Sequence, residues 1–157
     1  MEISLSYEQA KEKALRLLEF RSHSEKELSD KLKRAGASGE DIDRVLEFCR
    51  HYGFVNDRDY AIRKAKDLRN LKKFGKRRIY QELYTRGIAS EFIDEAIEEL
   101  DMSDNTEVLM PMVRKKLGGD FERKSVDRCI RYFLYRGYEF GEIKECIEQI
   151  KGETDDL

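Results

Sequence analysis

Residues 24–49 read SEKELSDKLKRAGASGEDIDRVLEFC, two amphipathic segments joined at Gly36. Equivalent glycines stand at Gly87 and Gly137, at spacings of 51 and 50 residues. Around each glycine the same apolar positions recur, at eight and four residues before it and at six, nine, ten and thirteen residues after it. A shared glycine and a shared apolar register predict a tandem repeat. The eighteen recurring positions are Leu28, Leu32, Ile42, Val45, Leu46, Cys49, Ile79, Leu83, Ile93, Ala96, Ile97, Leu100, Cys129, Phe133, Ile143, Cys146, Ile147 and Ile150.

This repeat predicts an all-α fold of three tandem three-helix modules. The modules are expected to form an elongated array that can curve along its length. A unit of about 50 residues buries too little apolar surface to be stable alone, so neighbouring units are expected to pack in a row. We expect modules at residues 1–52, 53–102 and 103–150, and a frayed acidic tail at 151–157. Helices are expected near residues 7–21, 25–35 and 40–52, and near 57–72, 76–86 and 90–100.

Helix-start signals support this division. Ser24 precedes Glu27 by three residues, which is the pattern of a capping box. The same position, twelve residues before each repeat glycine, falls on Gly75 in the second module and on Ser125 in the third. We therefore expect the middle helix of each module to begin directly after this position.

The first helix of the third module contains Pro111, the one proline of the chain. Because proline lacks a backbone donor and clashes with the preceding turn, this helix is expected to be kinked or to start late. Gly118 and Gly119 are expected to end it.

Composition indicates a soluble helical protein. Charged residues make up 41% of the chain, and no apolar run approaches the roughly 20 residues that span a bilayer. The N-terminal residues MEISLS lack the regions of a signal peptide, so we expect a cytoplasmic protein with no membrane partner. Nothing in the apolar pattern requires a dimer, and a monomer is expected. The cysteines Cys49, Cys129 and Cys146 occupy apolar repeat positions and are interpreted as small buried hydrophobes.

No pattern of catalytic residues is present, so we expect no enzymatic activity and no cofactor or metal. His23 and His51 have no nucleophile at a recognised spacing, and the Gly75-Lys76 pair lacks the remainder of a phosphate-binding loop. Glu95, Glu98 and Glu99 are interpreted as a solvated helix face rather than a nuclease metal site.

The net charge of −2 is unevenly distributed. Residues 63–78 contain nine basic residues against one acid, a local charge of +8, which leaves −10 on the rest. Lys66, Arg69 and Lys73 fall on one helix face, which directs Leu71 with Ala61, Ala65 and Leu68 to the core. Three cations, Lys76, Arg77 and Arg78, open the next helix against its macrodipole, so an anionic partner is favoured there.

These positions form the predicted partner-binding or nucleic-acid-binding set, with Phe74, Tyr80 and Tyr84 interleaved for base or partner contacts. The alternative is a solvated face on a lysine-rich helical protein. The main set comprises Lys66, Arg69, Lys72, Lys73, Lys76, Arg77 and Arg78. A weaker basic cluster around Tyr132 and Tyr135 contains Arg123, Lys124, Arg128, Arg131 and Arg136. Its first four residues, Arg123, Lys124, Arg128 and Arg131, form a second predicted set.

Three segments resemble the RecX family, bacterial regulators of the RecA recombinase: RSHSEKELSDKL at residues 21–32, GFVNDRDYA at residues 53–61 and FGKRRIYQELYTRGI at residues 74–88. The resemblance spans nearly the whole chain and is strongest in the second module. Within it, Gly53, Phe54, Tyr60, Leu83 and Gly87 are interpreted as turn or packing residues.

The resemblance implies a non-enzymatic regulator of recombination, repair and the SOS response. Such proteins bind the RecA filament on single-stranded DNA, lie in its groove and limit its growth, with loss of ATP hydrolysis, strand exchange and coprotease activity. The implied partners are RecA and single-stranded DNA within or near the filament.

Two other functions remain open. One is a stand-alone DNA-binding helical regulator, although the candidate recognition helix at residues 90–100 is acidic, which suits a major groove poorly. The other is an interaction scaffold with no nucleic-acid role.

Overall fold

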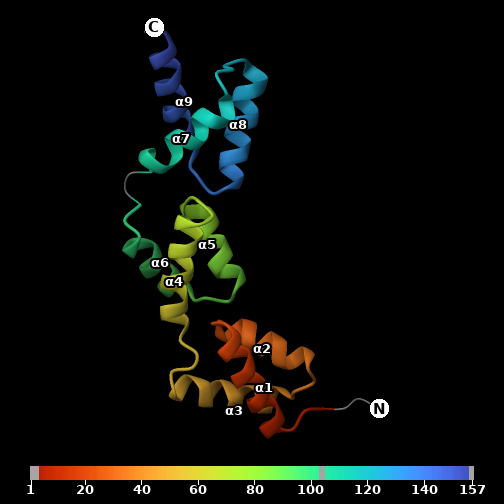
Figure 1. Cartoon of the computed structure of the whole chain (residues 1–157). Helices are drawn as coiled ribbons and strands as arrows, with labels where there is room; N and C mark the ends of the chain where they lie inside the picture. Colours follow the sequence, from red (N-terminus) through yellow and green to blue (C-terminus); the bar gives the residue numbers. More distant parts are fainter. Residues whose placement is uncertain (1–3, 103–104, 156–157) are drawn as a thin grey trace. The chain divides into compact units, whose positions relative to one another are not determined.

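The computed structural model describes residues 4–102 and 105–155 of the 157-residue chain. Over these residues the chain forms nine helices and no strand, as expected for an all-α fold (Figure 1). The helices are α1 (Tyr7–Phe20), α2 (Glu25–Arg34), α3 (Gly39–His51), α4 (Asp57–Asn70), α5 (Lys76–Thr85), α6 (Ser90–Glu99), α7 (Thr106–Leu117), α8 (Arg123–Tyr135) and α9 (Phe140–Asp155).

The chain divides into two compact units, each of which has its own core. The first unit comprises Met1–Lys64 and Leu83–Ala96, and the second comprises Ala65–Glu82 and Ile97–Leu157. In the first, α1, α2 and α3 pack on one another around Leu28, Leu32 and Val45. In the second, α7, α8 and α9 do so around residues such as Val113 and Phe133. Helices α4, α5 and α6 each contribute residues to both units.

The repeat glycines end their helices in the same way. Gly36, Gly87 and Gly137 have positive φ values of 99°, 80° and 99°, a region that glycine adopts without steric cost. In each case the glycine N–H and the following N–H bond back to the final turn, for example Gly36 to Lys33 and Ala37 to Leu32. This pair of hydrogen bonds is the Schellman motif, and all three repeat glycines form it. The predicted register is confirmed as well, since all eighteen apolar repeat positions are buried except Leu46 and Leu100, which are half-buried.

Consecutive repeats make the same kind of contact within each unit. In the first unit, Ser24 caps α2 and its hydroxyl also donates to Arg86 O at 2.7 Å, directly after the end of α5. In the second unit, Gly75 N–H donates to Arg136 O at 2.8 Å and Arg77 N–H donates to Gly137 O at 3.1 Å. The N-terminus of one middle helix therefore meets the C-terminal turn of the next, which satisfies backbone groups at both helix ends.

Several local expectations are wrong. Of the two alternatives given for the first helix of the third module, a kink or a late start, the late start does not occur, because α7 begins at Thr106 and includes Pro111. Ser125 lies inside α8 rather than before it, because Asp120 accepts bonds from the Glu122 N–H and the Ser125 hydroxyl and allows an earlier start. Gly118 ends α7 in a left-handed conformation, as expected.

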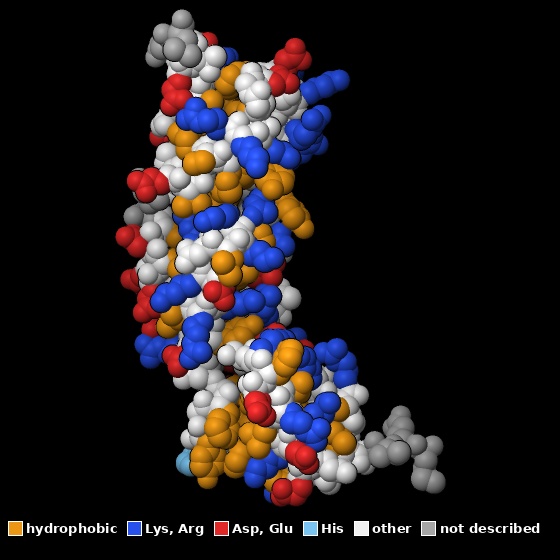
Figure 2. All heavy atoms as spheres, viewed as in Figure 1, with side chains coloured by type: hydrophobic (Ala, Val, Ile, Leu, Met, Phe, Trp, Pro, Cys, Tyr) orange, Lys and Arg blue, Asp and Glu red, His pale blue; other side chains and the backbone are white. Residues whose placement is uncertain are grey.

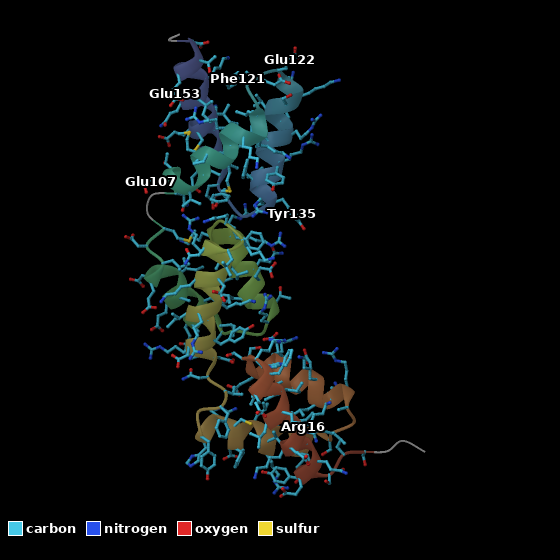
Figure 3. The ribbon with its side chains drawn as sticks, viewed as in Figure 1. Arg16, Glu107, Phe121, Glu122, Tyr135 and Glu153 are labelled. Carbon is cyan, nitrogen blue, oxygen red and sulfur yellow. The ribbon has the colours of Figure 1, made fainter. Side chains whose placement is uncertain are left out.

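Two further elements differ from expectation. The tail expected to fray from residue 151 is helical through Asp155, where Glu153, labelled in Figure 3, pairs with Arg114 of α7 at 2.7 Å. Leu71, expected in the core, is 76% exposed because α4 ends one residue before it.

Candidate partner-binding surface

The basic segment at residues 63–78 occupies the second half of α4, a loop at residues 71–75 and the first turn of α5. From Ala65 onward it belongs to the second unit. Five of the seven predicted residues have exposed side chains that form no hydrogen bond or ion pair within residues 4–102 and 105–155. These are Lys66, Lys72, Lys73, Lys76 and Arg77.

Arg69 differs from these five because its guanidinium is committed to the interior. Its Nη2 donates to Asn105 Oδ1 at 2.7 Å, and its Nη1 lies 3.4 Å from both Phe74 O and Tyr138 Oη. Asn105 is only 7% exposed, and its Nδ2 donates to Glu142 Oε2 at 2.6 Å. Asn105 therefore links Arg69 to Glu142. Arg69 therefore braces the second unit and is not available to a partner as the lysines are.

Arg78 is also engaged within the protein. Its Nε donates to Glu82 Oε1 at 2.8 Å and its Nη1 donates to Tyr135 O at 3.3 Å. The hydrogen bond to Glu82 raises the pKa of the Arg78 guanidinium, and the side chain is 20% exposed. Its guanidinium lies 4.8 Å from the ring centres of Phe74 and Tyr135, so it holds α5 and α8 together.

The start of α5 does not need a bound anion. Carbonyl oxygens at the end of α8 accept bonds from its first backbone donors, as Arg136 O does from Gly75 and Gly137 O does from Arg77. A helix C-terminus carries partial negative charge, so it complements the positive N-terminus that a phosphate would otherwise occupy. The cations of this turn therefore project from a helix start whose Gly75 and Arg77 donors are already bonded within the protein.

The second predicted set lies on α8. Arg123, Lys124, Arg128 and Arg131 are all exposed, and Figure 2 shows Lys and Arg side chains gathered along this helix at the upper right. Arg123 comes within 4.0 Å of Asp127, an exposed and therefore weak pair. Spacings of four and three residues put Lys124, Arg128 and Arg131 on one helix face.

Aromatic rings connect the start of α5 with the end of α8 within the second unit. The Phe74 ring lies between the guanidiniums of Arg78 and Arg136, at 4.8 and 5.0 Å from their central carbons. Arg136 also lies 5.6 Å from the Tyr132 ring. Tyr135, at the end of α8 and labelled in Figure 3, is 74% exposed. The structure thus brings the start of α5 and the end of α8 into one surface, whereas Tyr84 belongs to the first unit.

Three residues support this surface: Asn105 and Tyr138, which were not predicted as parts of it, and Arg136, which was predicted only as a member of the weaker basic cluster. Tyr138 is fully buried, and burial raises the pKa of its phenol, which donates to Lys73 O at 2.7 Å. The Arg136 guanidinium donates to Lys72 O. Arg136 and Tyr138 lie in the third repeat, about 65 residues from the loop, so only the folded contact between repeats reveals their role.

The five family-pattern residues interpreted as structural divide into three groups. Tyr60 and Leu83 are buried, and burial together with a hydrogen bond to Glu27 raises the pKa of Tyr60 to about 12. Gly53 and Gly87 adopt positive φ. Phe54 is instead half exposed and stacks against Tyr52, with ring centres 6.1 Å apart.

Other kinds of site find no support in the described residues. They contain no group of three or more His, Cys, Asp or Glu side chains placed to hold a metal ion. The three cysteines are free and buried, as expected. In the portion of the chain that the structure describes, every helix is too short or too polar to cross a bilayer.

Comparison with known proteins gives a consistent set of relatives. The model of the RecX first three-helix domain matches residues 10–49, and that of the RecX second three-helix domain matches residues 56–97. The regulatory protein RecX of Clostridioides difficile is 33% identical over 92% of this chain and 69% of its own length. RecX of Salmonella arizonae is 32% identical over 89% of this chain and 90% of its own length.

A solved structure shares the fold. The crystal structure of RecX from Lactobacillus salivarius matches with a TM-score of 0.80, covering 92% of this chain and 96% of that one. Sequence identity is 19%, so this match speaks for the fold alone.

Proposed function

Because this chain belongs to the RecX family of regulatory proteins, we propose that it binds the RecA filament on single-stranded DNA and inhibits its extension. In this proposal the protein lies in the groove of the filament. Slower extension then reduces ATP hydrolysis, strand exchange and coprotease activity. The partners are RecA and the single-stranded DNA within or near the filament, and the protein acts as a monomer in the cytoplasm, without chemistry of its own.

The observation that carries this proposal is the group of exposed cations in the second unit. Lys72, Lys76 and Arg77 project from a loop and helix start that are fixed by backbone bonds to the third repeat. Cations held in this way suit a phosphate backbone or an acidic protein surface, and binding of either kind weakens with salt.

Tandem repeats add a second advantage. A filament presents the same surface at regular intervals, so a chain of similar modules engages several protomers at once. Each additional contact is then intramolecular, and modest individual interfaces add up to tight overall binding through effective concentration. In this proposal the protein therefore acts even when it is scarcer than the recombinase.

The rival function, duplex reading by a helix of the second repeat, has little support. The side chains of Glu91, Asp94, Glu98 and Glu99 are exposed on α6. A helix that presents four carboxylates is repelled by the phosphates bordering a major groove.

The test is a charge reversal confined to exposed residues. The triple variant Lys72→Glu, Lys76→Glu and Arg77→Glu leaves Arg69 and Arg78 in place, because those two support the fold. We expect the variant to retain its helicity, since glutamates suit the first turn of α5, and to lose inhibition of RecA ATP hydrolysis on single-stranded DNA.

The matched control is Lys13→Glu, Lys33→Glu and Lys151→Glu, which makes the same change of charge at exposed positions elsewhere. This control is expected to inhibit like the unmodified protein. If the test variant inhibited RecA ATP hydrolysis at the same protein concentration as the control variant, the exposed basic residues would not be the contact.

A further inference from the structure

Leu71 stands out on the surface of the second unit. It is 76% exposed, directly after the last residue of α4 and directly before Lys72 and Lys73. In the described part of the chain, the other large hydrophobic side chains with high exposure are all aromatic, which makes Leu71 the one aliphatic member of this group. A single exposed leucine is ordinary, so its meaning depends on how the chain around it is held.

The loop at residues 71–75 is rigidly held despite its position on the surface. Four of its five N–H groups are bonded: those of Leu71 and Lys72 donate to Asp67 O, that of Phe74 donates to Leu68 O and that of Gly75 donates to Arg136 O.

Side chains complete this arrangement from the carbonyl side. The Arg136 guanidinium donates to Lys72 O, and the buried Tyr138 phenol donates to Lys73 O at 2.7 Å. Arg69 reaches Phe74 O at 3.4 Å. Three side chains thus hold three successive carbonyl groups of one short loop. Such a loop loses little conformational freedom when a partner binds, which favours affinity.

The backbone of this loop is also strained at one residue. Lys73 has a φ of 58°, a left-handed backbone conformation that residues other than glycine rarely adopt. Strained residues that the surrounding structure holds in place are found preferentially at binding sites. Here the hydrogen bonds of the loop hold Lys73 in this conformation, two residues after Leu71.

We propose that Leu71 is a docking anchor that inserts into an apolar pocket bordered by carboxylates on a protein partner, the recombinase protomer. The proposal rests on the function proposed above and adds a protein contact to it. An aliphatic side chain gains free energy by leaving water for an apolar pocket, whereas it offers a phosphate nothing and stacks poorly on a base. Lys72 and Lys73 beside it match acidic residues at the rim of such a pocket.

The experiment compares Leu71→Ala with Phe20→Ala. Phe20 is 88% exposed at the end of α1 and provides a matched truncation of a surface hydrophobe. Binding of each variant and of the unmodified protein is measured twice, once to RecA assembled on single-stranded DNA and once to the same DNA alone. Because Leu71 is exposed, its truncation is expected to leave thermal unfolding unchanged, which circular dichroism checks.

For Leu71→Ala we expect binding to the RecA filament to weaken by about tenfold or more, with unchanged binding to bare DNA. Phe20→Ala is expected to bind both like the unmodified protein. Equal filament binding by Leu71→Ala and Phe20→Ala would overturn the anchor while leaving the proposed function intact. Equal weakening of Leu71→Ala on filament and bare DNA would place Leu71 against nucleic acid and overturn the protein contact. If the unmodified protein fails to bind the filament, the proposed function fails and the anchor fails with it.

Discussion

The backbone of Gly75 lies directly against the backbone of Gly137, where the second and third repeats meet. A Cβ atom built on Gly75 would stand 2.5 Å from Gly137 O, and one built on Gly137 would stand 2.3 Å from Arg78 N. Both neighbours are backbone atoms, which cannot move away without disturbing the contact. The loop and the start of α5 depend on this close approach, since α8 supplies their hydrogen-bond partners.

Alanine at either glycine is therefore expected to be strongly destabilising. Gly75→Ala and Gly137→Ala should each lower the free energy of unfolding by about 2 kcal/mol or more, through steric overlap and, at Gly137, its φ of 99°. Urea denaturation measures the loss. Gly141→Ala is the control, because no atom lies within 4 Å of its added Cβ and alanine favours helix α9. Equal stability of all three variants would contradict the tight contact.

Arg69 is expected to matter for stability where Lys66 does not. Arg69→Ala leaves Oδ1 of the buried Asn105 without its donor, so the free energy of unfolding should fall by about 1–3 kcal/mol. Lys66→Ala changes an exposed side chain on the same helix and should stay within about 0.5 kcal/mol of the unmodified protein. Chemical denaturation of the two variants side by side distinguishes them, and equal losses would show that Arg69 is not an internal brace.

His23 predicts a dependence of stability on pH. The side chain is 2% exposed, with Nδ1 2.9 Å from Arg21 O and Nε2 2.8 Å from Lys31 Nζ. These partners fit a neutral ring that donates from Nδ1 and accepts at Nε2. Burial, followed by the nearby charges of Arg21 and Lys31, lowers the pKa of His23 below its ordinary value of 6.5. The unfolded chain therefore binds a proton more readily than the folded one, and stability is lost as pH falls below about 6.5.

The check is urea denaturation at several pH values between 7.5 and 5.5, with His23→Gln for comparison. Glutamine does not titrate, so the decline in stability over this window should be smaller in the variant than in the unmodified protein. Parallel declines in the two proteins would assign the pH dependence to other groups.

The periodic features of the fold were predictable because they depend on local chemistry. In each repeat a glycine, at Gly36, Gly87 or Gly137, ends the helix by adopting a left-handed backbone conformation. The apolar spacing around these glycines determines which helix faces are buried. The capping box at Ser24 is equally local and forms as expected. Leu71 was predicted in the core because its spacing continues that of α4, but the helix ends at Asn70 and the continuation does not exist.

The candidate site was only partly predictable, for a physical reason. The location of the basic residues follows from the sequence, but their availability depends on partners distant in the chain. Arg69 is bonded to Asn105, 36 residues away, and Arg78 bonds to Tyr135, 57 residues away. In the sequence, both arginines belong to the same basic segment as Lys72 and Arg77, which remain exposed. Charge patterning alone does not separate a structural arginine from one that meets a partner.

ATP hydrolysis by RecA on single-stranded DNA, with this protein added below stoichiometry at two salt concentrations, tests the central claim most directly. We expect inhibition at a small fraction of the RecA concentration, because the protein acts on filament extension, and weaker inhibition at the higher salt, because exposed cations contribute to binding. Unchanged hydrolysis at equimolar protein, with the recombinase of the same organism, would contradict the proposed regulation of RecA.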